Sequence, residues 1–365
     1  MVRQFACPAH RAARAALLVL ALSGLAGTAL AQSAPSCHPD GRPAGAEVIF
    51  NSSGGTYGDA IQRVFFTPFE RDCGIKVTHV NSQRNYAQLR QFVRSGNLLW
   101  DIGATVADQE MPLGIRDGLF HKLPPGFWDR IAPEMIPGSF TDYGAWATPY
   151  SQVLVYSREA FPDGLKGWAD FWDVARFPGP RALANNPIML AVALVADGVP
   201  LDKIYPMDLD RAFRKLDQIR PHIRTFYRTA DQGVQGVANG EFVAASTLSG
   251  RAVVAMRSSP RVATAWEGAV LHMSWTFILK DSPRARAAEA LLYYMQRADR
   301  QAELAKLTGY TGGNRRTLEL LDREVIETLP ATPERLATAS LVNAEWWADN
   351  NARVVQRWDA WMAQR

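Results

Sequence analysis

The chain has 365 residues, of which 47% are hydrophobic, and it carries 40 Lys and Arg against 36 Asp and Glu. Three of those basic residues lie in the first 31 positions, so the formal net charge of +4 falls to about +1 for the rest of the chain. Balanced, interspersed charge offers no clustered Lys and Arg for nucleic acid or anionic lipid, and we expect neither as a partner. Since one hydrophobic core seldom grows beyond about 250–300 residues, we expect two lobes.

The first 31 residues have the pattern of a secretory signal peptide. A basic opening precedes an apolar run over 15–30, which small residues interrupt and which ends in Ala29-Leu30-Ala31. This ending is typical of a cleavage site, so a cleaved leader is favoured over a membrane anchor. No second long apolar segment follows Ala31, which predicts an exported protein without direct membrane insertion.

Export affects the cysteines. Cys7 would leave with the leader, and Cys37 and Cys73 would remain as an even pair in an oxidising compartment. Cys37 precedes an apolar run at 48–50, and Cys73 directly precedes another at 75–80. If these runs are neighbouring parallel strands, both cysteines lie at the same end of the sheet. We predict a disulfide between them, with two free structural thiols as the alternative.

Strand-like and helical segments alternate along the chain, which predicts the α/β class with a mainly parallel sheet covered on both faces. A strand at 47–50 is followed by a helix at 59–70, whose last turn Pro68 should disturb. The next strand is expected at 75–80, and a helix and a third strand at 98–102 follow it.

The second half of the chain repeats this alternation. Asp208 should cap a helix that Pro221 ends. Further strands and helices are expected at 153–156, 223–227, 272–279, 283–296 and 299–307. A terminal helix should bury a stripe formed by Trp347, Val354, Trp358 and Trp361.

Motifs of nucleotide-binding and hydrolytic enzymes are absent from the sequence. The histidines beyond the leader are scattered and never at metal-ligand spacing. We therefore expect no catalytic residue, no metal site and no cofactor. The adjacent Tyr293 and Tyr294 fall inside an amphipathic helical pattern, which favours core packing over a role in metal binding.

One loop stands out chemically, Asn51-Ser52-Ser53-Gly54-Gly55-Thr56-Tyr57-Gly58 between the first strand and the first helix. In open parallel sheets, ligands bind beyond the carboxyl ends of the strands, where backbone N–H groups and short hydroxyls are available. The loop predicts a small-molecule site, and an ordinary tight turn is the alternative. Trp275 is expected in the same site, because a returning strand should pass the cleft there and an indole offers a stacking surface.

Several further segments together resemble the exported solute-binding proteins of bacterial ABC importers, in the branch for spermidine and putrescine. The segments are Asn51 to Ala60, Trp100-Asp101-Ile102, Trp168-Ala169-Asp170-Phe171-Trp172-Asp173, Phe177-Pro178-Gly179-Pro180-Arg181-Ala182-Leu183 and Glu345-Trp346-Trp347-Ala348-Asp349-Asn350. The resemblance implies a periplasmic receptor with a two-lobed type II fold, a membrane permease as partner, and hinge closure over a solute in the cleft. Lobe 1 would take 32–147 with 275–328, and lobe 2 would take 148–274 with 329–365.

The resemblance also implies which residues line the cleft. They are Ser52, Ser53, Tyr57, Thr105, Asp108, Tyr150, Ser151, Asn186, Ser249, Ser274 and Trp275. For each of them, a role in a turn, a helix cap or packing is the alternative.

Departures from the branch bear on the ligand. Polyamine binders of this type usually carry an acidic residue where this chain has Ser274, and Leu248 replaces a common tryptophan. A buried ammonium without a carboxylate costs several kcal/mol, so a polyamine would need Asp108, Asp231 or Asp59 as its partner. A polyamine-like solute is the first hypothesis, and a carboxylated or amino-acid-derived solute is its rival. An exported enzyme and a receptor that signals to a membrane sensor are further alternatives.

Overall fold

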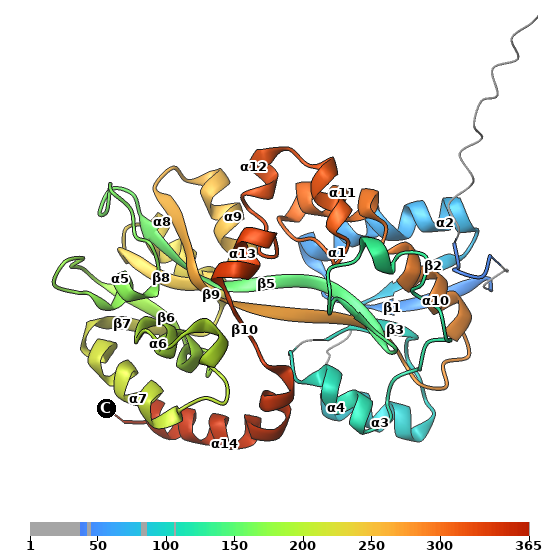
Figure 1. The fold of residues 1–365 in the computed structure, drawn as a ribbon, viewed down its shortest axis with the longest axis horizontal. Helices are drawn as coiled ribbons and strands as arrows, with labels where there is room; N and C mark the ends of the chain where they lie inside the picture. The colour runs from blue at the N-terminus through green and yellow to red at the C-terminus, as the bar shows by residue number, and fades with distance from the viewer. Residues whose placement is uncertain (1–36, 42–44, 82–85, 106, 365) are drawn as a thin grey trace, which may run out of the picture. The chain divides into compact units, whose positions relative to one another are not determined.

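The computed structural model describes residues 37–41, 45–81, 86–105 and 107–364, so the expected leader lies outside the described residues. Its strands form one sheet of mixed direction (Figure 1). The order across the sheet is β2 (Lys76–Val80), β1 (Glu47–Asn51), β3 (Ile102–Ala104), β9 (Val262–Ile278), β5 (Gly144–Ser157), β8 (Ala244–Leu248), β6 (Arg181–Ala184) and β7 (Ile223–Tyr227). Two short strands, β4 (Phe140–Thr141) and β10 (Ser340–Leu341), pair with β5 and β9.

The α/β class is confirmed, but the expectation of a mainly parallel sheet is wrong at its centre. The outer groups β2-β1-β3 and β8-β6-β7 are parallel, whereas β9 is antiparallel to β3 and to β5, and β5 is antiparallel to β8. The segments expected as short strands at 153–156 and 272–279 are parts of β5 and β9, which have 14 and 17 residues. Their extra length comes from pairing with each other, which no local pattern in either segment reveals.

The first helix and the third strand also differ from expectation. The helical chain begins at Gly55 and runs through α1 (Gly55–Ile61), a five-residue π segment and α2 (Thr67–Cys73). Pro68 lies in the first turn of α2, where its missing N–H interrupts no α-helical hydrogen bond. The helix therefore continues past Pro68 to Cys73. The third strand begins only at Ile102, because the Asp101 carboxylate before it accepts the Ile49 N–H (2.8 Å) and turns the chain.

Helices cover the sheet on both faces. They include α3 (Tyr86–Ser95), α4 (Glu110–Arg116), α5 (Trp168–Trp172), α6 (Met189–Ala196), α7 (Leu209–Ile219), α8 (Ala230–Ala238), α9 (Ser249–Ser258), α10 (Ala285–Tyr294), α11 (Ala298–Thr308), α12 (Arg323–Ile326), α13 (Pro333–Thr338) and α14 (Ala344–Met362). Asp208 caps α7 by accepting the Arg211 N–H, as predicted. In the part of the chain that the structure describes, no helix is both long and apolar enough to cross a bilayer.

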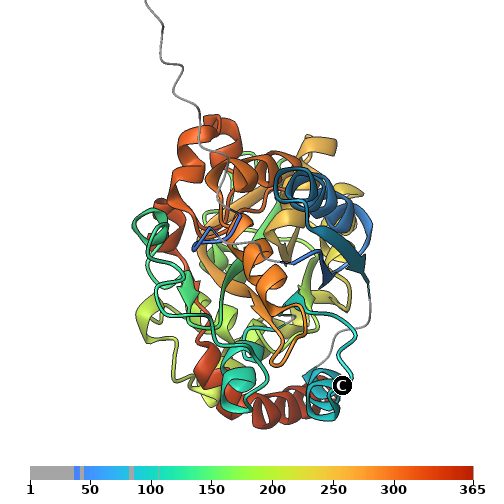
Figure 2. The same ribbon diagram turned by 90° about the vertical axis from the view of Figure 1, so that its right-hand side faces the viewer.

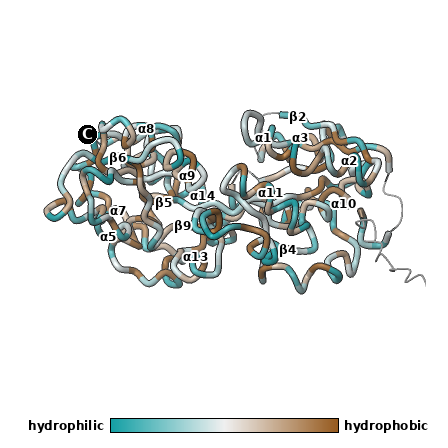
Figure 3. The backbone as a smooth tube through the Cα atoms, turned by 90° about the horizontal axis from the view of Figure 1, so that it is seen from above, coloured by the Kyte–Doolittle hydropathy of each residue, from teal (hydrophilic) through white to brown (hydrophobic). Residues whose placement is uncertain are grey.

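The two largest clusters of buried hydrophobic residues lie between these helices and the sheet. One packs α6, α7 and α14 against the sheet and contains the predicted stripe of Trp347, Val354, Trp358 and Trp361. The other packs α1, α2 and α10 against β1, and Tyr293 and Tyr294 are buried in it, as expected. The tube in Figure 3 is brown along many of these buried segments and teal on many connecting turns. The described residues belong to one compact unit, so the lobe boundaries stay a prediction.

The structure joins Cys37 and Cys73 in a disulfide, the pairing favoured by the sequence. Cys73 is the last residue of α2, and Cys37 lies upstream of β1. Because β1 and β2 are neighbouring parallel strands, the bridge ties the approach to one strand to the approach to the next.

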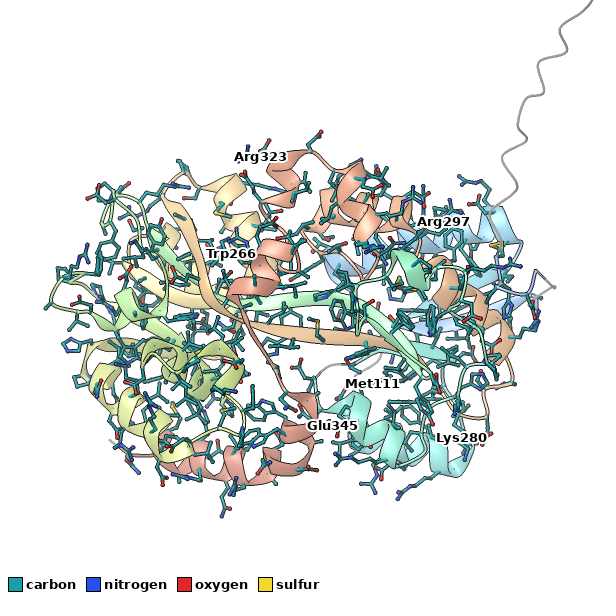
Figure 4. The ribbon with its side chains drawn as sticks, in the orientation of Figure 1. Met111, Trp266, Lys280, Arg297, Arg323 and Glu345 are labelled. Carbon is teal, nitrogen blue, oxygen red and sulfur yellow. A yellow bond between two sulfur atoms is a disulfide. The ribbon has the colours of Figure 1, made fainter. Side chains whose placement is uncertain are left out.

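Helix α14 returns the end of the chain to α4. Arg116 on α4 donates to the carboxylates of Glu345 and Asp349 on α14, with 2.5 Å between Arg116 Nη1 and Asp349 Oδ1. Figures 1 and 2 both place the two helices side by side, and Figure 4 shows Glu345 beside Met111 of α4. These side chains are exposed, so we assign the ion pairs only a small contribution to stability.

Candidate functional site

The middle of the β5-β9 ribbon carries the most distinctive group of side chains. Tyr150 of β5 pairs with His272 of β9, and their rings stack with centroids 4.7 Å apart and planes 4° from parallel. His272 is 8% exposed. The two strands thereby present stacked aromatic rings at the middle of the ribbon.

Asp108, in the segment before α4, contacts His272 and completes this group. Its Oδ2 lies 2.6 Å from Nδ1 of His272, and its Oδ1 accepts the Met273 N–H at 2.8 Å. Asp108 is 9% exposed. Both oxygens of this buried carboxylate are therefore engaged by β9.

The tyrosines of the group stay protonated over the physiological pH range. Burial raises the pKa of Tyr150, and the nearby Asp108 carboxylate raises it further. Burial also raises the pKa of Tyr310, which lies in the loop after α11. Neutral phenols can donate to a ligand oxygen or present an aromatic face to it.

Tyr310 reaches two segments far from it in sequence. Its ring makes an edge contact with Tyr57 of α1, with centroids 6.2 Å apart. A Cβ atom on Gly250, in the first turn of α9, would lie 2.1 Å from the Tyr310 hydroxyl. Gly250 thus permits the close approach of Tyr310, which brings α1, α9 and the loop after α11 together.

Thr105, Ser274 and Trp275 form a second set of contacts along β9. The Thr105 N–H donates to the carbonyl of Trp275 (2.8 Å), and the Trp275 N–H donates to the Thr105 hydroxyl (2.9 Å). The Ser274 hydroxyl donates to the Thr105 carbonyl at 3.3 Å. These backbone contacts hold the loop after β3 against β9, where Trp275 is half-buried.

The remaining predicted residues lie in loops and at strand or helix ends, and most make hydrogen bonds there. Ser52 is buried, and its hydroxyl lies 2.8 Å from Nε2 of His79. Ser249 accepts the Ser151 N–H at 3.1 Å. Asn186 is exposed, and its side chain accepts the Ile188 N–H at 2.9 Å, so it stabilises the turn into α6. Ser53 lies in the exposed part of the loop between β1 and α1.

Two cavities lie outside this group. One of 660 Å³ is lined by residues that include Tyr205, Leu336 and Val342, and one of 270 Å³ by residues that include Glu134, Arg297 and Asn314. Neither is lined by a residue that the sequence placed in the site. Among the described residues, no three His, Cys, Asp or Glu side chains are arranged to hold a metal ion.

Sequence reasoning missed two residues that the structure brings to the group. The sequence does not assign His272 to the site, because its partner Asp108 is 164 positions away. Tyr310 lies in the run Gly309-Tyr310-Thr311-Gly312-Gly313. An aromatic residue between glycines is the signal that could have pointed to it.

Comparison with known proteins decides the family. Residues 65–332 match the family described as bacterial extracellular solute-binding protein. The gamma-aminobutyric acid-binding protein of Pseudomonas aeruginosa is 31% identical over 86% of this chain and 90% of its own. The chain belongs to this solute-binding family.

Solved structures of solute-binding proteins share the fold. An ABC transporter substrate-binding protein from Bradyrhizobium japonicum USDA 110 is 31% identical with a TM-score of 0.80, covering 87% of this chain and all of its own. The structure of the Atu4243-GABA receptor is 30% identical with a TM-score of 0.77, covering 87% of this chain and 98% of its own. These likenesses confirm the two-lobed type II fold of periplasmic binding proteins and a role as a solute receptor of ABC transport.

The resemblance to the polyamine branch has weaker support. A putrescine/agmatine-binding protein of Pseudomonas aeruginosa is 24% identical over 44% of this chain and 50% of its own. The membership of the solute-binding family is therefore shown, whereas the branch is not.

Proposed function

We propose that this protein is the periplasmic receptor of an ABC importer and that its solute is a small amino acid, with gamma-aminobutyric acid (GABA) as the type compound. The solute would lie against Tyr150, His272 and Tyr310, within the cleft whose lining the sequence predicts. Closure of the two lobes would enclose it and prepare it for delivery to the membrane permease.

The choice of an amino acid over a polyamine rests on whether the nearby carboxylates are free to bind an ammonium group. Both oxygens of Asp108 are engaged by His272 and by the Met273 N–H. Asp231 lies 3.3 Å from Arg251, and Asp59 is exposed on α1. A buried diamine needs a carboxylate for each of its ammonium groups, and none of the three acids named from the sequence is both buried and unengaged. A zwitterion has one ammonium group fewer to satisfy, and its own carboxylate needs hydrogen-bond donors instead.

The relatives support the same choice. The two proteins named for GABA are each at least 30% identical to this chain over most of its length, whereas the putrescine/agmatine-binding protein matches less than half of it. A polyamine stays the alternative, because Tyr150 and Trp275 provide the aromatic surfaces on which an ammonium group stacks.

Thermal unfolding tests the ligand class directly. We expect GABA to raise the Tm of the purified protein, because a ligand at 100 times its Kd stabilises the folded state by about 2.7 kcal/mol. Putrescine at the same concentration should leave the Tm unchanged, and calorimetry should give the Kd of each compound. A shift with putrescine alone would replace this proposal with the polyamine alternative, and turnover of either compound would support the enzyme alternative.

Trp275→Ala tests the position of the site. We expect the variant to bind GABA at least about tenfold more weakly, equivalent to about 1.4 kcal/mol, because a large aromatic contact surface is lost. Its fold should persist, because the bonds to Thr105 use only the backbone of residue 275. Trp266→Ala is the control, since Trp266 lies against Arg335 instead. Unchanged affinity in the Trp275 variant would remove this residue from the site.

The location and the partner of the protein are part of the proposal. The leader pattern at 1–31 supports export, and the family itself is described as extracellular. Cell fractionation should place the mature protein in the periplasm with its first 31 residues removed. Retention of the full-length chain in the membrane would contradict it.

A further inference from the structure

Polar atoms without hydrogen-bond partners lie along the central strands. Gln152 and Ser340 are 3% and 0% exposed, and neither the Gln152 amide nitrogen nor the Ser340 hydroxyl has a partner among the described residues. His272 is 8% exposed, and within the same part of the chain its only side-chain hydrogen bond uses Nδ1, which leaves Nε2 unbonded. An unsatisfied buried donor typically costs about 1–3 kcal/mol, so the Gln152 and Ser340 groups point to a ligand beside His272.

The strand register places the three groups on one face. Gln152 of β5 pairs with Val270 of β9, and Val270 also pairs with Ser340 of β10. Tyr150 pairs with His272 two positions further along both strands, so its side chain and those of His272 and Gln152 share that face. Diagonal neighbours of this kind have Cα atoms about 7–8 Å apart, within reach of one small ligand for long side chains.

The hydrogen bond to Asp108 determines which nitrogen of His272 is available to a ligand. An ionised carboxylate only accepts hydrogen bonds, so the proton on Nδ1 points to Asp108. A solute carboxylate at Nε2 would place a carboxylate against each ring nitrogen, an arrangement in which the ring donates from both nitrogens. The stacked face of Tyr150 fixes the plane of the ring.

We propose that the Nε2 groups of His272 and Gln152 donate hydrogen bonds to the carboxylate of the solute, with Asp108 and Tyr150 holding the imidazole in place. Ser340 adds a hydroxyl on the same face. This inference rests on the proposed function and names the part of the site that selects an amino acid over a diamine. The Asp108 carboxylate is thus used to orient a donor, and it does not bind the ammonium group.

The charge of the solute provides the probe for this site. The carboxyl group of a simple amino acid such as GABA titrates at about pH 4, so the solute keeps its negative charge throughout the neutral range. The uncharged amide of the same compound lacks that charge, so it should depend much less on the donors of His272 and Gln152.

The test measures three probes by calorimetry at neutral pH: GABA, its uncharged amide 4-aminobutanamide, and putrescine. The proteins are the full exported chain and its variants His272→Phe, which keeps the stacked ring without a donor, and Gln152→Met, which keeps the volume. We expect each variant to weaken GABA binding by about 10- to 100-fold, the range for a lost hydrogen bond to a charged group. The affinity for the amide should change less than about threefold, and His222→Phe, at an exposed histidine, should change neither.

The outcomes separate this inference from the proposed function. If the wild-type protein binds GABA but both variants leave the affinity unchanged, the carboxylate is held elsewhere and only this inference fails. If the variants weaken GABA and the amide equally, the groups have a structural role or bind water, and this inference fails again. If the wild-type protein does not bind GABA, both fail. A loss of GABA affinity in His272→Phe that spares the amide supports the proposal even if the Gln152 variant fails to fold.

Discussion

Replacing Arg181 with methionine should lower the free energy of unfolding by about 3 kcal/mol, because three backbone carbonyls lose the same buried donor together. Arg181 begins β6 and is 1% exposed. Its guanidinium donates to the carbonyls of Phe171 (2.9 Å), Gly179 (2.7 Å) and Phe177, which all precede it in the chain. Urea unfolding should show a lower midpoint with an unchanged m-value.

The environment of Arg181 explains why the expected loss of stability in the Arg181→Met variant is not larger. No carboxylate makes a hydrogen bond to this guanidinium in the described residues, and burial lowers the pKa of Arg181. Removing the charge recovers part of its desolvation cost, so the loss is smaller than for breaking a buried ion pair. Arg176→Met is the matched control, since Arg176 is exposed nearby and should change stability by less than about 0.5 kcal/mol. A loss below about 1 kcal/mol at Arg181 would mean that water reaches the three carbonyls in the variant.

Removing the Cys37–Cys73 bridge should have an effect of similar size or larger. The bridged residues are 36 positions apart, and closing a loop of that length in the unfolded chain is worth about 4 kcal/mol in the chain-entropy estimate. We expect the double variant Cys37→Ser/Cys73→Ser to lower the Tm by roughly 5–10 °C. Calorimetry of the variant and the wild-type protein, each with and without reductant, measures the effect.

The same experiment contains its control. Reductant should lower the Tm of the wild-type protein to the value of the double variant and should leave the variant itself unchanged. If the wild-type protein and the variant melt at the same temperature without reductant, the bridge contributes no stability. The side-chain contacts of His38 with Asp40 and Glu289 would then hold this segment by themselves.

Much of the fold follows from local patterns. The sequence predicts the cap of α7 at Asp208, the aromatic stripe of α14 and the alternation of strands and helices. These features are predictable because caps and hydrophobic periodicity depend on residues only a few positions apart. The pairing of the two cysteines was readable because parallel neighbouring strands place both at one end of the sheet.

The central strands and the site were less predictable. The 14 residues of β5 and the 17 of β9 contain polar, aromatic and bulged stretches, so the length of each depends on the other strand. The sequence indicates single candidate residues, but it does not indicate which side chains form hydrogen bonds with them. Asp108 was expected as a partner for a cation, whereas in the structure it binds His272 and the backbone of Met273.

The sequence by itself determined the α/β class and the two cysteines that could pair, and it predicted a set of hydroxyl and aromatic residues for a small polar solute. Only the tertiary structure decided that the sheet is antiparallel at its centre, that Tyr310 lies against Gly250, and that His272 is held by Asp108 and Tyr150. The physical reason is distance along the chain. Secondary structure depends on neighbours, whereas the charge and hydrogen bonds of a buried group depend on segments that meet only when the chain has folded.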